Sequence, residues 1–249
     1  MIRRALRRGD QPRDHGFSLI ELLVSMVIFG ILITLITGLL IKTQNQVAGL
    51  KVRIDDVDQA RMAVDATTRA IRTAIEPAQL QVSCGNCSGT VSQSTAFTYA
   101  SATKAQFFTN NGSTTNGPTL VTIATMVVNG VNVIMKTTQP PDASSVGMNW
   151  TYNACTIGSA GCLIQQLVIA RGIPTGLTLF NYYDETPAEL VPSAGASLGS
   201  YGLNSIDSVA VNVTLANSNK FTAAKPTTIM ARVQLPNART GLISVSPSP

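Results

Sequence analysis

The chain has few charged residues and almost no histidine. Only 12% of its 249 residues are Asp, Glu, Lys or Arg, and its one histidine is His15. Everything after His15 therefore lacks the commonest metal ligand and the usual base of Ser–His or Cys–His catalysis. Glycine-rich phosphate loops and paired-carboxylate motifs are also missing. We therefore expect no enzyme activity, no catalytic residue, no metal and no cofactor.

Charge is also missing from a long stretch near the N-terminus. From Phe17 to Ile41 the only charged residue is Glu21. A helix of about 25 residues rises roughly 37 Å, which is enough to cross a hydrocarbon core of about 30 Å. An unpaired carboxylate in lipid is costly, so we expect Glu21 to have a partner there.

The residues before this apolar run are basic. Five positive and two negative side chains give a charge of +3: Arg3, Arg4, Arg7, Arg8 and Arg13 against Asp10 and Asp14. Basic flanks stay in the cytoplasm, so the rest of the chain should lie outside it. The apolar run is too long for an ordinary secretory signal, and no Ala-x-Ala follows it. Without this +3, the formal charge of +5 falls to +2, so we do not expect a nucleic-acid partner.

The run Gly16-Phe17-Ser18-Leu19-Ile20-Glu21, followed by Leu22-Leu23-Val24, resembles the signature of type IV prepilins and type II secretion pseudopilins. The resemblance implies cleavage after Gly16 by a prepilin peptidase and N-methylation of the new terminus at Phe17. It also implies that Glu21 neutralises the terminal amine of a neighbouring subunit during assembly, which would supply its partner. The alternative is a plain signal-anchor helix with a stray glutamate.

A helical pattern continues beyond the apolar run. Apolar residues recur at steps of three, four or seven, which predicts one buried helix face: Val47, Leu50, Ile54, Val57, Val64, Ile71 and Ile75. Pro77 ends the pattern. Gly30 and Gly38 weaken the membrane half, where pilins often melt in the filament. The alternative role for these two glycines is to allow close packing of helices. The chain has no proline between Phe17 and Ile75.

After Pro77 the sequence reads as short strands between turns, rich in Val, Ile, Thr and aromatic residues. We expect strands at Ala96–Tyr99, Ala105–Phe108, Leu120–Val127, Val131–Lys136, Asn149–Tyr152, Leu163–Ala170, Leu177–Tyr183, Ile206–Leu215 and Thr227–Leu235. Asn129-Gly130 predicts a hairpin. The stretch from Thr186 to Gly202 is rich in Ser, Ala, Gly and Pro and is expected to be a long surface loop.

The expected fold class is α+β, with a long N-terminal helix packed on a C-terminal antiparallel β-sheet head, as in pilins. The expected domains are a leader (1–16), the transmembrane half of the helix (17–41), its amphipathic half (42–76), a β-rich head (77–243) and a disordered tail (244–249).

Four cysteines lie in the expected head: Cys84, Cys87, Cys155 and Cys162. An oxidising compartment favours disulfides, and three pairings are possible. Proximity in the sequence suggests the disulfides Cys84–Cys87 and Cys155–Cys162. The two crossed pairings would instead link the region of Cys84 and Cys87 covalently to that of Cys155 and Cys162. A zinc site of four thiolates is an alternative, although the gap between Cys155 and Cys162 is wide for one. A redox role for Cys84 and Cys87 lacks the usual βαβ context.

The stretch from Leu163 to Leu215 is similar to the C-terminal half of W-type minor pilins and J-type pseudopilins. This resemblance implies a minor subunit of a type IV pilus or type II secretion-like filament that helps to initiate or cap assembly. The alternative is a pilus-borne binding head for adhesion or DNA uptake. Implied partners are other pilin or pseudopilin subunits, a prepilin peptidase/methyltransferase, an inner-membrane assembly platform and membrane lipid. The implied location is a single pass in the cytoplasmic membrane with the head outside, and then a filament in the periplasm or at the cell surface.

Overall fold

The structure, a computed structural model, describes residues 18–77, 95–110, 117–142, 150–216 and 226–236. The chain divides into two compact units, residues 1–48 and 49–249, and each is described by itself. Several sequence predictions lie outside the described residues: those on Gly16, Phe17, Cys84, Cys87 and the tail 244–249.

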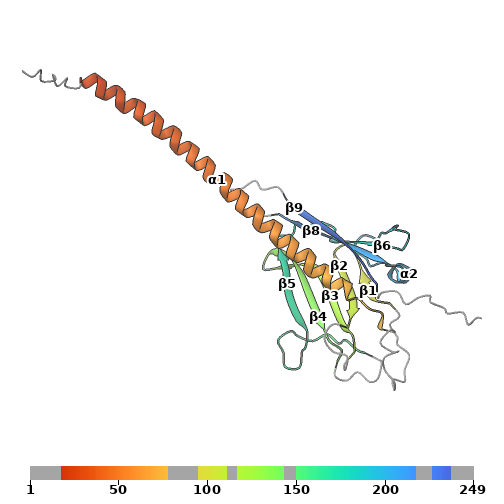
Figure 1. Cartoon of the computed structure of the whole chain (residues 1–249). Helices are drawn as coiled ribbons and strands as arrows, with labels where there is room; N and C mark the ends of the chain where they lie inside the picture. The colour runs from red at the N-terminus through yellow and green to blue at the C-terminus, as the bar shows by residue number, and fades with distance from the viewer. Residues whose placement is uncertain (1–17, 78–94, 111–116, 143–149, 217–225, 237–249) are drawn as a thin grey trace, which may run out of the picture. The chain divides into compact units, whose positions relative to one another are not determined.

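Helix α1 runs unbroken from Leu19 to Arg72 and passes through Gly30 and Gly38 (Figure 1). It ends earlier than the expected Ile75. Beyond the helix, Ala74 forms a β-bridge with Thr109, and the Ile75 N–H donates to the Phe108 carbonyl at 2.9 Å. The helix therefore ends where the chain begins to pair with a strand, several residues before Pro77 could terminate it.

Two antiparallel sheets follow α1. The first has the strand order β1-β2-β3-β4-β5, with bounds Phe97–Ala100, Lys104–Thr109, Thr119–Val128, Val131–Gln139 and Gln165–Arg171. The second has the order β7-β6-β8-β9, formed by β6 (Phe180–Tyr183), β7 (Glu189–Leu190), β8 (Ser208–Leu215) and β9 (Thr227–Gln234). A short helix, α2 (Ser200–Asn204), precedes β8. The α+β layout with antiparallel sheets is thus confirmed.

The predicted hairpin between β3 and β4 is also confirmed. Val128 pairs with Val131, and Asn129 and Gly130 between them have φ angles of 51° and 76°. Two successive positive φ angles are what a type I′ turn requires, and Asn-Gly supplies them at low cost.

The face of α1 that packs on the sheets consists mainly of small residues. Its buried side chains are Ala60, Ala63, Val64, Thr67, Thr68, Ala70 and Ile71. The predicted apolar face was therefore wrong at its N-terminal end, because Val47, Leu50 and Ile54 are 59–61% exposed. Alanine lets the helix backbone approach the sheets closely, so alanine spacing rather than bulky residues marks the contact.

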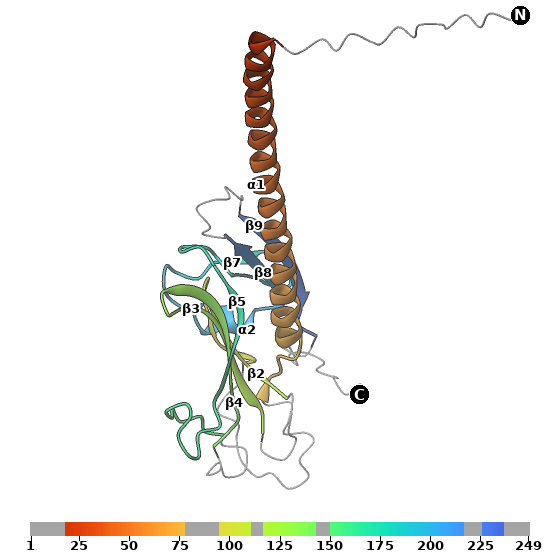
Figure 2. The same ribbon diagram turned by 90° about the vertical axis from the view of Figure 1, so that its left-hand side faces the viewer.

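Both sheets contribute to the same core as the C-terminal part of α1 (Figure 2). Phe97 of β1 and Tyr182 of β6 meet edge to face, with ring centroids 6.3 Å apart. The buried Tyr182 hydroxyl donates to the Ser101 carbonyl at 3.0 Å. Burial raises the pKa of Tyr182 well above its ordinary value, so this hydroxyl stays a donor.

Two other sequence predictions need correction. The sequence predicted a strand that includes Trp150–Tyr152, but these residues form no strand in the structure. Instead, the Tyr152 hydroxyl donates to the Pro118 carbonyl, and the Tyr152 ring packs on Phe108. The expected loop from Thr186 to Gly202 contains β7 and the start of α2. Leu198 in that stretch is buried in the core, and its N–H donates to the Ala100 carbonyl of β1 at 2.8 Å.

Candidate functional site: the membrane segment and the disulfide loop

The N-terminal part of α1 exposes large apolar side chains. Every residue from Leu19 to Ile41 is exposed, with Leu19 at 85% and Ile33 at 48%. Among the described residues, α1 is the one helix long and apolar enough to cross a membrane. Lipid suits such a surface, so this segment fits a single-pass membrane anchor.

Glu21 lies in the first turn of this apolar segment. Its N–H donates to the Ser18 carbonyl at 3.0 Å and to the Ser18 hydroxyl at 3.3 Å. Its own carbonyl accepts from the Ser25 hydroxyl at 2.8 Å. A carboxylate here is favoured by the helix dipole, but it forms no ion pair within the described part of the chain.

The role of Ser18 was missed in reading the sequence. Ser18 and Glu21 have the Ser-x-x-Glu spacing of a capping box directly before an apolar run. That spacing by itself predicts that Ser18 caps the helix. The cap fixes the first turn of α1 and with it the position of Glu21. Gly16 and Phe17 precede the described residues, so cleavage and methylation at this bond remain predictions.

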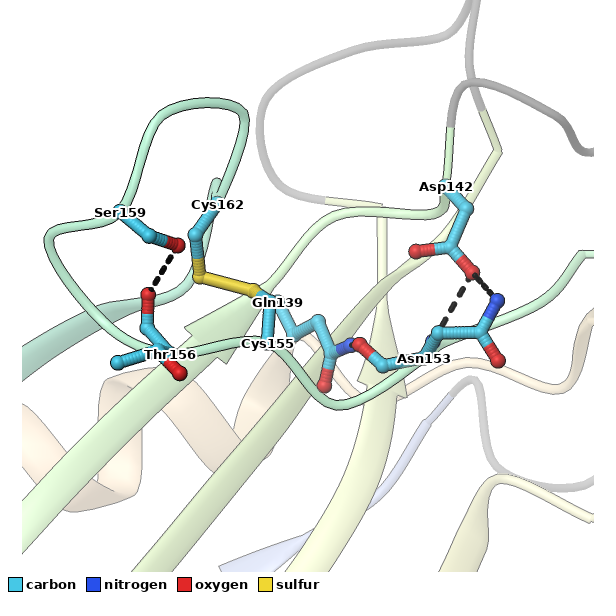
Figure 3. The surroundings of a disulfide bond; sticks show 7 residues. All are labelled: Gln139, Asp142, Asn153, Cys155, Thr156, Ser159 and Cys162. Carbon is cyan, nitrogen blue, oxygen red and sulfur yellow. Dashed lines mark hydrogen bonds between the residues drawn. A yellow bond between two sulfur atoms is a disulfide. The ribbon is translucent and has the colours of Figure 1, made fainter.

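A disulfide joins Cys155 and Cys162 in the long connection between β4 and β5 (Figure 3). Their Cα atoms are 5.7 Å apart, and the bond closes a short loop. Inside the loop, the Ser159 N–H and hydroxyl both donate to the Thr156 carbonyl, at 3.0 and 2.6 Å. Gly158 and Gly161 both have φ near 85°, a conformation that favours glycine. The loop is thus held in one shape while its residues 155–161 stay exposed.

The base of this loop is held by polar contacts. The Asp142 carboxylate accepts from the Asn153 backbone N–H at 2.9 Å and from its side-chain amide at 2.7 Å (Figure 3). The Gln139 amide donates to the Asn153 carbonyl at 2.8 Å. Burial and, to a lesser extent, the nearby Asp142 charge raise the pKa of Tyr152 above its ordinary value. These contacts tie the loop to the end of β4.

Among the described residues there is no cluster of three or more His, Cys, Asp or Glu side chains that could hold a metal ion. Cys155 and Cys162 are bonded to each other, so neither is a thiolate ligand in this structure. The described residues instead present an apolar helical segment with the acid Glu21 in its first turn, and an exposed loop closed by the Cys155–Cys162 disulfide.

Comparison with known families gives one match. Residues 11–37 match the family model described as the prokaryotic N-terminal methylation motif. No curated protein and no solved structure matched the chain. The matched region spans the bond after Gly16, the acid Glu21 and the start of the apolar helix. With the α+β layout, the motif supports a type IV prepilin-like pilin or pseudopilin.

Proposed function

We propose that this type IV prepilin-like chain is a minor pilin or pseudopilin, a structural subunit that helps to initiate or cap a type IV pilus or type II secretion-like filament. The observation that carries the proposal is the methylation motif at residues 11–37, which overlaps an apolar stretch up to Ile41 whose only charge is Glu21. The head lies outside the cytoplasm, and its partners are other pilin or pseudopilin subunits. A prepilin peptidase/methyltransferase and an inner-membrane assembly platform act on the chain before it joins them.

The minor role has two lines of support. The membrane half of α1 contains no proline and is continuous through Gly30 and Gly38, unlike the broken helix of many major pilins. The stretch from Leu163 to Leu215 is also similar to W-type minor pilins and J-type pseudopilins.

A binding head for adhesion is the second candidate, and the exposed disulfide loop favours it. DNA uptake has less support. Two of the cations on the head are already stacked on aromatic rings, Lys104 on Tyr99 and Arg232 on Tyr183. Such pairs leave fewer free cations and rings for a nucleic-acid strand.

The first test concerns processing at Gly16. Replacing Gly16 with a bulky residue should block cleavage, because only a small residue fits the peptidase site before Phe17. Intact mass and N-terminal sequencing of membrane extracts should find a methylated Phe17 terminus for the wild type and an uncut chain for Gly16→Leu. A wild-type terminus elsewhere would contradict the assignment.

The second test concerns Glu21. Glu21→Ala and the isosteric Glu21→Gln should both be cleaved and inserted normally, because removing a charge makes insertion easier. Both should enter filaments about tenfold less, since the amine of a neighbouring subunit then loses its counter-charge. The measurement is the ratio of filament-associated to membrane-held protein in the native host.

A control for Glu21 is Asp58→Ala, which removes an exposed acid from the same helix. The ratio of filament-associated to membrane-held protein for Asp58→Ala should match that of the wild type. If Glu21→Gln also matches the wild type, Glu21 does not recruit a neighbour, and the assembly role proposed for it is wrong.

A further inference from the structure

A hollow of about 510 Å³ lies between the end of α1 and the five-stranded sheet. Four threonines line it, and we call it the threonine hollow: Thr73, Thr109, Thr119 and Thr138. All its described lining residues belong to the unit 49–249. Sites for small molecules usually have volumes of about 300–1,000 Å³, so the threonine hollow has room for one.

Strand pairing places the polar lining residues of the sheet on one face. Thr138 of β4 pairs with Val121 of β3 on one side and with Gln165 of β5 on the other. Lys136 and Thr138 are alternate residues of β4, and Thr119 and Val121 are alternate residues of β3, so each pair points to one face. Hydroxyl, ammonium and amide groups therefore border the same hollow.

The protein itself does not use these polar groups. The side chains of Thr119, Lys136, Thr138 and Gln165 form no hydrogen bond or ion pair with another described residue. The first three of them are half-buried. None of the described residues that line the hollow is acidic. A ligand with complementary groups would supply the partners that these side chains lack.

Other contacts hold the walls of the threonine hollow in place. The Thr109 hydroxyl donates to the Thr73 hydroxyl at 2.8 Å, and the Thr73 hydroxyl donates to the Ala70 carbonyl at 2.6 Å. These two bonds fix the end of α1 against β2. Cys162, which also lines the hollow, is fixed by its disulfide to Cys155 (Figure 3). A hollow whose walls are already fixed binds a ligand at a lower cost in conformational entropy.

Two other hollows of the head lack this combination. The hollow of about 360 Å³ at the end of β5 is lined by Asp55 and Asp56 as well as Arg171, so it contains charges of both signs. A hollow of about 760 Å³ contains Arg72 and Arg232, but all its described lining residues are exposed. The threonine hollow differs from both, because it combines half-buried polar groups with charge of one sign.

The chemistry of the lining residues indicates the class of ligand. The Lys136 ammonium is a donor only, and a carboxylate forms a charge-assisted hydrogen bond with it. Threonine hydroxyls both donate and accept, so they match hydroxyl groups. Ala70 and Val121 also line the hollow and are buried, which adds apolar surface for carbon-bound hydrogens. A molecule with one carboxylate, several hydroxyls and a compact carbon skeleton complements all three features.

We propose that the threonine hollow binds a sugar acid, with its carboxylate paired to Lys136 and its hydroxyls bonded to Thr119 and Thr138. The Lys136 ion pair selects an acid over a neutral sugar, because a neutral sugar leaves the half-buried ammonium without a counter-charge. The hydroxyl contacts select a sugar acid over a simple carboxylate, because a simple carboxylate leaves the threonines without partners.

The test uses the full chain, labelled at its threonine methyl groups, in micelles of a detergent without a sugar headgroup. The probes are D-galacturonate and D-glucuronate, with D-galactose, D-glucose and acetate as matched probes that lack one feature. NMR titration with at least one acid should shift the Thr119 and Thr138 methyl signals saturably and leave that of Thr228 on β9 in place. The neutral sugars and acetate should bind at least about tenfold more weakly.

Three variants separate the contributions. Lys136→Gln should weaken binding of the acid about tenfold, to the level of its neutral sugar. Lys104→Gln removes a half-buried lysine from the other face of the same sheet and should leave binding unchanged. Thr138→Val keeps the shape and removes one hydroxyl, so it should weaken acid and neutral sugar alike, by about three- to tenfold. The emission of Trp150, the only tryptophan of the chain, reports whether each variant is folded.

Absence of saturable shifts at Thr119 and Thr138 with both acids would overturn the inference. So would equal affinities for an acid and its neutral sugar, or wild-type affinity of folded Lys136→Gln. The titration needs no filament and no processing, so its outcome is independent of the filament role proposed above.

Discussion

The two ends of helix α1 use opposite kinds of side chain on their contact surfaces. From Leu19 to Ile41, large aliphatic residues cover every face and all are exposed. From Ala60 to Ile71, the buried face is mostly alanine and threonine. A helix that is apolar all round suits lipid, whereas a helix packed on sheets needs one apolar face and gains from small residues there. One helix thus follows two packing rules because its ends meet two environments.

The largest expected effect comes from enlarging the alanine face. Ala63 is completely buried, so Ala63→Leu should destabilise the head by about 1–3 kcal/mol through overpacking. Thermal unfolding followed by Trp150 emission, with the full chain in detergent, should show a lower midpoint.

The matched change at the other end of α1 is Leu35→Ala, at a residue 65% exposed. It should leave the midpoint of head unfolding unchanged. Similar shifts for Ala63→Leu and Leu35→Ala would mean that the two ends of α1 do not differ in the way described.

A smaller effect, of opposite sign, is expected at Thr67. Its hydroxyl is buried without a hydrogen-bond partner in the part of the chain that the structure describes. Thr67→Val keeps the shape and removes this unmatched polar group, so it should stabilise the head by about 1 kcal/mol. The same melting experiment checks this.

Thr34 serves as the comparison for Thr67 in the apolar end. Its hydroxyl donates to the Gly30 carbonyl at 2.8 Å, so it already has a partner. Thr34→Val should not change the melting of the head. A lower midpoint for Thr67→Val would show that the Thr67 hydroxyl is satisfied in solution.

The smallest effect concerns the charged pair near the end of α1. The Arg69 and Asp65 side chains are 2.6 Å apart at their nearest atoms, but they are 76% and 57% exposed. Such an i,i+4 pair is worth at most about 0.5 kcal/mol, and salt weakens it. Arg69→Ala should lower the midpoint slightly at low ionic strength and not at 1 M salt, in contrast to the assembly defect expected for Glu21. A large loss that persists in salt would indicate that Arg69 packs as well as pairs.

Much of the head could be predicted from local patterns. Alternation along Val209, Val211 and Val213 predicts a half-buried strand, and Asn129-Gly130 predicts a turn. The strand and the turn are present, but Ser208 and Ala210 on the other face of the strand are buried too. β7 could not be predicted, since its two residues form a strand by pairing with Tyr182 and Tyr183 of β6. Trp150–Tyr152 have strand-like composition, but the Tyr152 hydroxyl and ring bind to residues of other elements instead.

The sequence by itself determined the apolar segment that fits a membrane anchor. An uninterrupted apolar run with one acid at its start predicts a helix long enough to span a bilayer, because length and hydrophobicity act locally and need no tertiary partner. Tertiary structure alone decided which later residues of α1 are buried. Leu50 and Ile54 are apolar yet exposed, and Thr67 is polar yet buried, because burial depends on where the sheets lie against the helix. The same holds for β5, whose position at the end of the described five-stranded sheet is set by the order of strands rather than by its own seven residues.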